Sequence, residues 1–219
     1  MSTQREKLVA AAVDLLERDG VQALSVRNLA AELGTSTMAV YTHFGNMAGL
    51  LDAVGAEALT RFSDALSDVP PTDDAVAGFF LLGLAYHRFA MANPQRYQLI
   101  FGTATPASLL AVRSDVTVTG RPTTRAEWAV SFEGLHASVR RMIDAGRIRD
   151  DGSLPMAARL WTMCHGAVML EMAGYFGHEG HGLTEILGPM AIDILVGMGD
   201  DREKATGSLA TAVELAGGY

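Results

Sequence analysis

The chain has 219 residues, of which 49% are hydrophobic, and a formal net charge of −8. Its single cysteine excludes an internal disulfide, and its first twenty residues carry charges where a secretory signal would have an apolar run. No apolar stretch reaches the roughly 20 uncharged residues of a membrane-spanning helix. We therefore expect a cytoplasmic protein with no membrane partner, whose apolar residues form a core, a cavity or a dimer interface.

The first fifty residues predict three helices that share one small core. The first helix ends at Asp19-Gly20 and repeats apolar residues at the helical period, namely Leu8, Ala11, Ala12, Leu15 and Leu16. Residues 25–44 predict two short helices joined by a tight turn, with Ser25 and Ser36 as N-caps and Gly34 ending the first of the two. This arrangement is typical of a helix-turn-helix.

Each helix of this motif has an apolar side that is expected to face the core: Leu29, Ala30 and Leu33 in the first helix, Val40 and Phe44 in the second. The second helix then directs Thr37, Met38, Tyr41 and Thr42 outward. Hydroxyls, an aromatic ring and methyl groups suit the major groove of DNA. Asn46 is expected to cap a fourth helix, whose apolar face comprises Leu50, Leu51, Val54, Ala58 and Phe62.

The stretch from about Arg5 to Leu51 resembles the DNA-binding domain of the TetR/AcrR family of transcriptional regulators. The resemblance rests on the helix, the Gly34 turn, the small N-cap and the run Tyr41-Thr42-His43-Phe44-Gly45-Asn46. It implies an all-α protein in which residues 1–46 form a helix-turn-helix DNA-binding domain and residues 47–219 form a larger helical ligand-binding and dimerisation domain. Many members carry a lysine that binds a DNA phosphate where this chain has Met47. Either the backbone N–H groups at the start of the fourth helix bind this phosphate instead, or the affinity for DNA is lower than usual.

By this resemblance the residues expected to touch DNA are Arg27, Ser36, Thr37, Met38, Ala39, Tyr41, Thr42 and His43. Arg27 is the side chain able to make a bidentate contact with guanine, and Ser36 starts a helix whose N–H groups can bind phosphate. Two alternatives stay open. Instead of binding DNA, Arg27 could pair only with Glu32 or with solvent. Tyr41 could be a half-buried residue of the core.

The net charge of −8 is unusual for a DNA-binding protein. Residues 1–50 carry four basic and five acidic side chains, so this domain sums to −1 and the remainder to −7. Arg5 and Lys7 are expected in an N-terminal arm. Because the Debye length is about 8 Å at physiological salt, the acidic body is largely screened from DNA. We predict modest non-specific affinity, which a steep salt dependence of binding would contradict.

The larger half alternates apolar helical runs with Pro-, Gly- and Asn-rich breaks, and it shows no strand pattern. The expected helices span residues 47–67, 73–92, 95–102, 105–115, 124–146, 154–177 and 184–199, followed by a weakly determined tail at 202–216. Pro189 either kinks its helix or marks its true start. The run Trp161-Thr162-Met163-Cys164-His165-Gly166 resembles a Trp-x-x-x-His-Gly signature of some TetR-like C-terminal domains.

The resemblance implies a small-molecule pocket and a four-helix dimer interface in this half. The residues expected to bind a small apolar ligand are Phe80, Leu84, His87, Trp128, Phe132, Trp161, His165 and Met169. These residues equally fit an ordinary core. The residues expected at the homodimer interface are Gly166, Ala167, Leu170, Ala173, Gly174, Ile186, Leu187, Met190, Ile194 and Met198. A two-fold dimer would place its recognition helices about one DNA turn, roughly 34–36 Å, or a multiple of it apart on a pseudo-palindromic operator.

An enzyme is disfavoured. Cys164 and His165 are adjacent and point about 100° apart on a helix, which suits no thiolate–base pair. The loop His178-Glu179-Gly180-His181 lacks further ligands at zinc spacing, so neither a metal nor a cofactor is expected. The sequence thus predicts a ligand-responsive, sequence-specific regulator that binds double-stranded DNA, a repressor released by a small apolar molecule. A dimeric DNA-binding regulator without small-ligand control, acting through a protein partner, remains the alternative.

Overall fold

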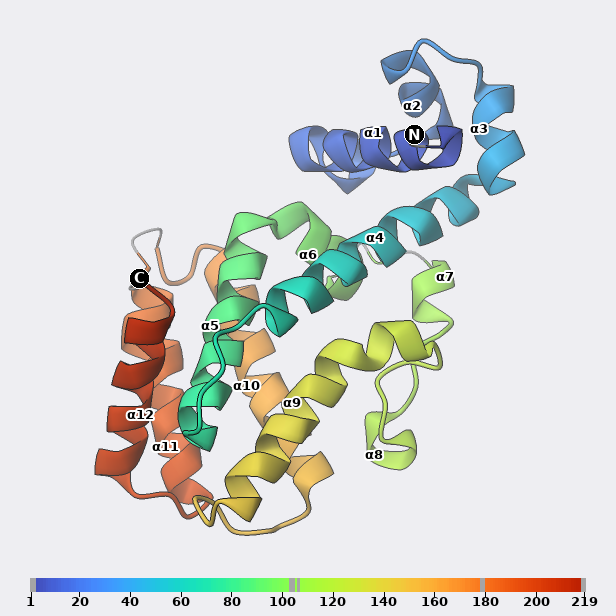
Figure 1. Cartoon of the computed structure of the whole chain (residues 1–219). Coiled ribbons are helices and arrows are strands. Elements are labelled where there is room, and N and C mark those ends of the chain that lie inside the picture. Colours follow the sequence, from blue (N-terminus) through green and yellow to red (C-terminus); the bar gives the residue numbers. More distant parts are fainter. Residues whose placement is uncertain (1–2, 103–104, 106, 178–179, 218–219) are drawn as a thin grey trace. The chain divides into compact units, whose positions relative to one another are not determined.

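The computed structural model describes residues 3–102, 105, 107–177 and 180–217, without the side chains of residues 107–108 and 126–128. This part of the chain is helical and contains no β-strand, which confirms the predicted all-α class (Figure 1). The chain divides into two compact units. The N-terminal unit comprises Met1–Phe62 and Ala92–Arg113, and the C-terminal unit comprises Ser63–Met91 and Ser114–Tyr219. The domain boundary at residues 46 and 47 stays a prediction.

The N-terminal unit is a small helical core with a helix-turn-helix. Its elements are α1 (Gln4–Asp19), the 3-10 turn η1 (Val21–Ala23), α2 (Val26–Glu32), α3 (Thr37–Phe44), α4 (Met47–Ser67) as far as Phe62, α6 (Pro94–Phe101) and α7 (Ala107–Leu110). The predicted caps are confirmed: the side-chain oxygens of Ser25, Ser36 and Asn46 accept hydrogen bonds from the N–H groups of Asn28, Ala39 and Gly49. Gly34 has φ +59°, a left-handed conformation that few residues adopt without strain.

Two predictions about this unit are wrong. Leu33 is 38% exposed, because α2 ends at Glu32 and Leu33 falls in the turn instead of on the buried stripe. Arg5 and Lys7 lie in the first turns of α1 instead of in an arm, because Thr3 caps this helix in a capping box with Glu6. The other predicted core positions hold, with Val40 1% exposed and Phe44 packed half-buried against the same cluster.

Helix α6 belongs to the N-terminal unit, although it lies far along the chain. Leu99 is fully buried in the same apolar cluster as α1 and α2. Arg96, 13% exposed, donates to Glu17 of α1 at 2.6 Å and to Glu57 of α4 at 3.0 Å. Its mostly buried guanidinium therefore ties three helices together, and the two carboxylates compensate its charge.

The C-terminal unit is a bundle of longer helices: α5 (Ala75–Ala92) up to Met91, the short α8 (Val116–Thr119), α9 (Ala126–Asp144), α10 (Ser153–Met172), the π-helical turn η2 (Gly182–Leu187), α11 (Gly188–Gly197) and α12 (Arg202–Leu215). Helix α10 packs against α9 and η2, and α11 packs against α12. Helix α5 is long and apolar enough to cross a membrane by length and composition, but most of it is buried, as in the core helix of a globular protein.

Two helix predictions in the larger half need correction, and the structure answers two points that were left open, the role of Pro189 and the order of the tail. The expected helix 105–115 is only α7, because Asp115 accepts from the N–H of Thr117 and starts the separate helix α8. Helix α10 ends at Met172, ahead of Gly174 with φ +85°, and does not reach residue 177. Pro189 stands at the start of α11, directly after the π-helical turn. The tail is an ordered helix, α12, which Asp201 caps.

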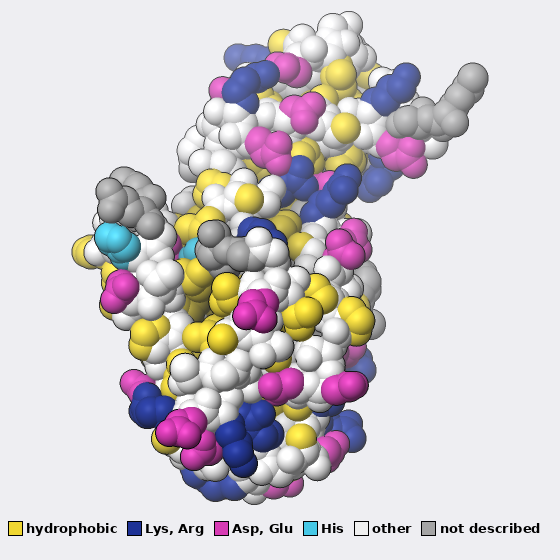
Figure 2. Space-filling model, turned by 60° about the vertical axis from the view of Figure 1, so that its left-hand side comes forward, with side chains coloured by type: hydrophobic (Ala, Val, Ile, Leu, Met, Phe, Trp, Pro, Cys, Tyr) yellow, Lys and Arg dark blue, Asp and Glu magenta, His cyan; other side chains and the backbone are white. Residues whose placement is uncertain are grey.

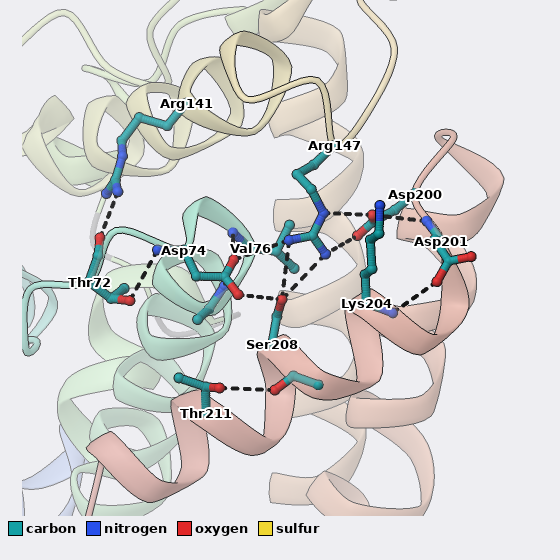
Figure 3. A network of polar contacts seen from close by, with 12 residues as sticks. Thr72, Asp74, Val76, Arg141, Arg147, Asp200, Asp201, Lys204, Ser208 and Thr211 are labelled. Carbon is teal, nitrogen blue, oxygen red and sulfur yellow. Dashed lines mark hydrogen bonds and ion pairs between the residues drawn. The ribbon is translucent and has the colours of Figure 1, made fainter.

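On the face that Figure 2 shows, charged side chains gather at one end of the C-terminal unit and hydrophobic side chains are scattered over its middle. The loops before α10 and α12 lie at the same end (Figure 1). At this end Arg147 binds both oxygens of Asp200 at 2.8 and 2.9 Å and reaches Asp74 at 3.2 Å (Figure 3). Ser208 of α12 donates to Asp74 at 2.6 Å, and Asp74 caps α5. This Arg147 network fastens α12 to the loop after α9 and to the start of α5.

Candidate functional site

The outward face of α3 is the first candidate site. Met38 is 70% exposed and Tyr41 is 44% exposed. The hydroxyl residues Ser36, Thr37 and Thr42 and the imidazole of His43 are also exposed on this helix, whereas Ala39 is half-buried. Thr42 donates to the Met38 carbonyl at 2.9 Å, which leaves its methyl group and the oxygen lone pairs outward. The face offers hydrogen-bonding groups and apolar contacts, which is what major-groove recognition uses.

Arg27 is exposed at the start of α2, and within the described residues it makes no ion pair. The carboxylate of Glu32, the partner named as an alternative, is instead held by both terminal nitrogens of Arg18 at 3.0 and 3.1 Å. Hydrogen bonds from Arg18 hold the pKa of Glu32 below its usual value. Arg27 is therefore available for a base or a phosphate, while Arg18 is not.

The turn after α3 is tight. The carbonyl of Phe44 lies so close to Gly49 that a Cβ there would clash with it, so position 49 tolerates no side chain without a backbone shift. Met47 stands where many members of the resembled family carry a lysine, and it is partly buried and packs against the core of the unit. A cation at this end of α3 must therefore come from another element.

The second candidate site is a run of aromatic contacts between α9, α10 and α5. The rings of Phe132 and Trp161 meet edge to face with centroids 5.7 Å apart, and the ring of His165 lies 6.1 Å from Trp161. The Tyr86 hydroxyl is 3.3 Å from Nδ1 of His165. Trp161 and His165 are half-buried, whereas Phe132 is buried.

A buried polar pair lies between the same helices, α5 and α10. Nε2 of His87 is 2.8 Å from Oε2 of Glu171, and the two side chains are only 5% and 10% exposed. Gly182 of η2 packs directly on this carboxylate, since a Cβ there would lie 2.5 Å from Oε2. Burying a carboxylate without a hydrogen-bonding partner is costly, so the imidazole of His87 and the carboxylate of Glu171 hold each other in place.

The predicted ligand residues thus fall into three groups. Phe132, Trp161 and His165 meet in the aromatic run, and His87 lies in the polar pair. Phe80 and Leu84 are buried and Met169 is half-buried, and the Phe80 ring lies tilted beside the Phe79 ring with centroids 5.5 Å apart. The side chain of Trp128 lies outside the described residues. The sequence analysis missed Tyr86 and Glu171. Glu171 had a signal, being a single acid in an apolar helix.

The predicted dimer residues are partly exposed. Leu170 is 47% and Ile186 is 39% exposed, and Gly166, Ala173 and Gly174 are exposed beside them. Met190 and Ile194 are half-buried. Three others, Ala167, Leu187 and Met198, are at most 6% exposed and pack inside the protomer, because they face neighbouring helices of the same chain. The surface available to a partner consists of the remaining seven.

Cysteine or metal chemistry would have to use Cys164 or the loop at residues 178–181. Cys164 is buried, and this burial raises the pKa of its thiol to about 12, so a thiolate is not formed near neutral pH. In the described part of the chain no three His, Cys, Asp or Glu side chains cluster for a metal. His178 and Glu179, two residues of the loop for which no metal is expected, lie outside the described part.

Both halves of the chain match models of one protein family. Residues 8–54 match the bacterial regulatory proteins of the tetR family, and residues 79–187 match the tetracyclin repressor-like C-terminal domain. The class C tetracycline repressor of Escherichia coli is 31% identical over 186 residues, which cover 84% of this chain and 73% of that protein.

Two further proteins are similar over most of their length. An HTH-type transcriptional regulator of Mycobacterium tuberculosis is 26% identical over 173 residues, covering 78% of this chain and 71% of the relative. The solved structure of a Rhodococcus sp. RHA1 protein has a TM-score of 0.69 and 24% identity, with coverage of 90% of this chain and 96% of that one. The latter likeness concerns the fold.

Proposed function

The chain belongs to the TetR family of DNA-binding transcriptional regulators, and on this premise we propose that it is a sequence-specific repressor that a small apolar molecule releases from DNA. Its relative in Escherichia coli is named as a tetracycline repressor, which supports a repressing role. The family is one of transcription regulators and not of enzymes.

Control by a small molecule rests on one observation, the aromatic run beside the buried pair of His87 and Glu171. Phe132, Trp161 and His165 supply apolar area with one polar ring, and Tyr86 orients that ring. Sites for small apolar ligands combine aromatic walls with a few placed polar groups. Since Trp161 and His165 are half-buried, a ligand can add to the contacts that they already make.

We propose that the protein acts as a homodimer on a pseudo-palindromic operator. The exposed small and apolar side chains of α10, η2 and α11 form the interface, with Leu170 and Ile186 as its largest exposed members. Ligand binding changes the spacing of the two reading helices through α4, which is continuous between the two units. The domains divide near residue 46.

The decisive experiment selects bound sequences from a random double-stranded DNA library with the purified protein. A pseudo-palindromic motif supports a dimeric regulator, and no enrichment even at low salt refutes the proposal. Small apolar compounds are then screened for release of the labelled operator. Trp161→Phe and His165→Gln should weaken release and leave operator affinity unchanged, while Thr162→Ala, an exposed position of the same helix, serves as the control.

The alternative, a regulator that answers to a protein partner, predicts a different result. The operator would be enriched, but no compound would release it, and the fluorescence of Trp161 would not respond to any of them.

A further inference from the structure

The N-terminal unit has few cations that are available to DNA. Helix α3 contains no Lys or Arg, and α4 contains none before Arg61. Arg18 binds Glu32 and Asp19, and Arg61 binds Glu57, so acids already compensate these charges. Arg96 is enclosed by two carboxylates. In the described part of the helix-turn-helix and its flanking helices, three basic side chains form no ion pair, namely Arg5, Lys7 and Arg27.

One of these three is held beside the end of α3. The guanidinium carbon of Arg5 lies 5.3 Å from the centroid of the Phe44 ring, within the range of a cation–π contact. Phe44 is the last residue of α3, and its ring meets the ring of His43 edge to face at 6.5 Å. Phe44 itself is anchored against the core. The contact holds the guanidinium beside the end of α3, and its N–H groups can still donate to a further partner.

The nearest acid on the same turn does not neutralise Arg5. The carboxylate of Glu6 accepts from the backbone N–H of Thr3 at 2.8 Å and completes the capping box of α1. An exposed guanidinium that lies over a ring and has no carboxylate partner is suited to bind phosphate by two parallel hydrogen bonds. It emerges from α1 and not from the outward face of α3, so it reaches the backbone and not the base edges.

We propose that Arg5 binds a DNA backbone phosphate at the C-terminal end of α3 and there supplies the positive charge that Met47 lacks. This inference rests on the DNA-binding function and adds a contact residue to it. Phosphate contacts fix the position of a reading helix on the duplex without selecting bases. Arg5 is thus a positioning contact for the face that carries Met38 and Tyr41.

The test compares the salt dependence of operator binding for the full-length protein, Arg5→Met and Arg5→Lys. Met keeps an apolar contact with the Phe44 ring but removes the charge. The log–log slope of binding against salt should fall by about 0.9 for each α3 helix bound, or about 1.8 for a dimer, so the affinity ratio of wild type to Arg5→Met should be about 12-fold larger at 50 mM than at 200 mM salt. Arg5→Lys should keep the wild-type slope.

The control is Arg61→Met, which removes one charge from α4 about 21 Å along the helix from Met47. This variant should leave the slope unchanged. If Arg5→Met lowers the melting temperature and keeps the wild-type slope, Arg5 has a structural role and the inference is wrong. If its loss of affinity occurs for the operator but not for scrambled DNA, it reads a base, and the inference is equally wrong. Absence of DNA binding by the wild type would refute the regulatory function itself.

Discussion

Replacing Arg147 by Met should destabilise the C-terminal unit strongly. The carboxylate of Asp200 is only 2% exposed, and it accepts two hydrogen bonds from Arg147 and one from the N–H of Asp201. The substitution leaves this buried charge without a counter-ion and also frees Asp74 and Ser208 from Arg147. Removing one partner of a buried pair costs about 3–5 kcal/mol. In a chain of this size that corresponds to a decrease in melting temperature of about 6–20 °C.

Urea unfolding and thermal melting measure this effect directly. Arg202→Met is the matched control, because its partner Asp193 is exposed and exposed pairs contribute about 1 kcal/mol or less. Adding Asp200→Asn to Arg147→Met should recover part of the loss, since an amide needs no counter-ion. The reasoning is refuted if Arg147→Met costs no more than Arg202→Met, or if the second substitution recovers nothing.

Three further predictions concern acid stability, base reading and assembly. Burial alone raises the pKa of Asp74, but hydrogen bonds from Ser208 and backbone N–H groups, with the charge of Arg147, hold this pKa below its usual 3.8. The ionised Asp74 therefore stabilises the fold above about pH 4, and this stabilisation is lost as the pH falls further. In Asp74→Asn, the free energy of urea unfolding should accordingly decrease less steeply between about pH 5 and 2. Arg27→Ala should relax specificity at one operator position by about 1–3 kcal/mol in competition binding, whereas a uniform loss over all sequences makes it a phosphate contact. Leu170→Glu should convert a dimer to a monomer in sedimentation, and a wild type that is monomeric at micromolar concentration contradicts the proposed assembly.

Local signals explain what the sequence predicted well. The N-caps Ser25, Ser36 and Asn46 and the helical period of α4 act within a few residues, so their consequences follow from adjacent sequence. The position of α6 could not be predicted in this way. Its attachment to the N-terminal unit depends on Arg96 meeting acids 79 and 39 residues away. Such pairs are tertiary contacts, and the hydrophobic periodicity of the sequence does not predict them.

The candidate sites show the same division. The outward face of α3 follows from which of its residues are apolar, and the exposed Met38 and Tyr41 agree with it. The partners of His87 and His165 do not follow, because Glu171 and Tyr86 lie 84 and 79 residues away from them. Helical spacing shows which side chains share a face, but which faces meet depends on the packing of α5 against its neighbours.

The pairing of cations also resolves the apparent conflict between an acidic chain and DNA binding. Arg18, Arg61 and Arg96 are compensated by acids of the same unit, so they contribute to its stability and little to its outer field. Attraction to phosphate then depends on the few cations outside ion pairs, of which Arg5 has a fixed position. With so few cations outside ion pairs, we expect a shallow salt dependence of DNA binding and a preference for an operator that comes mainly from the neutral, hydrogen-bonding face of α3.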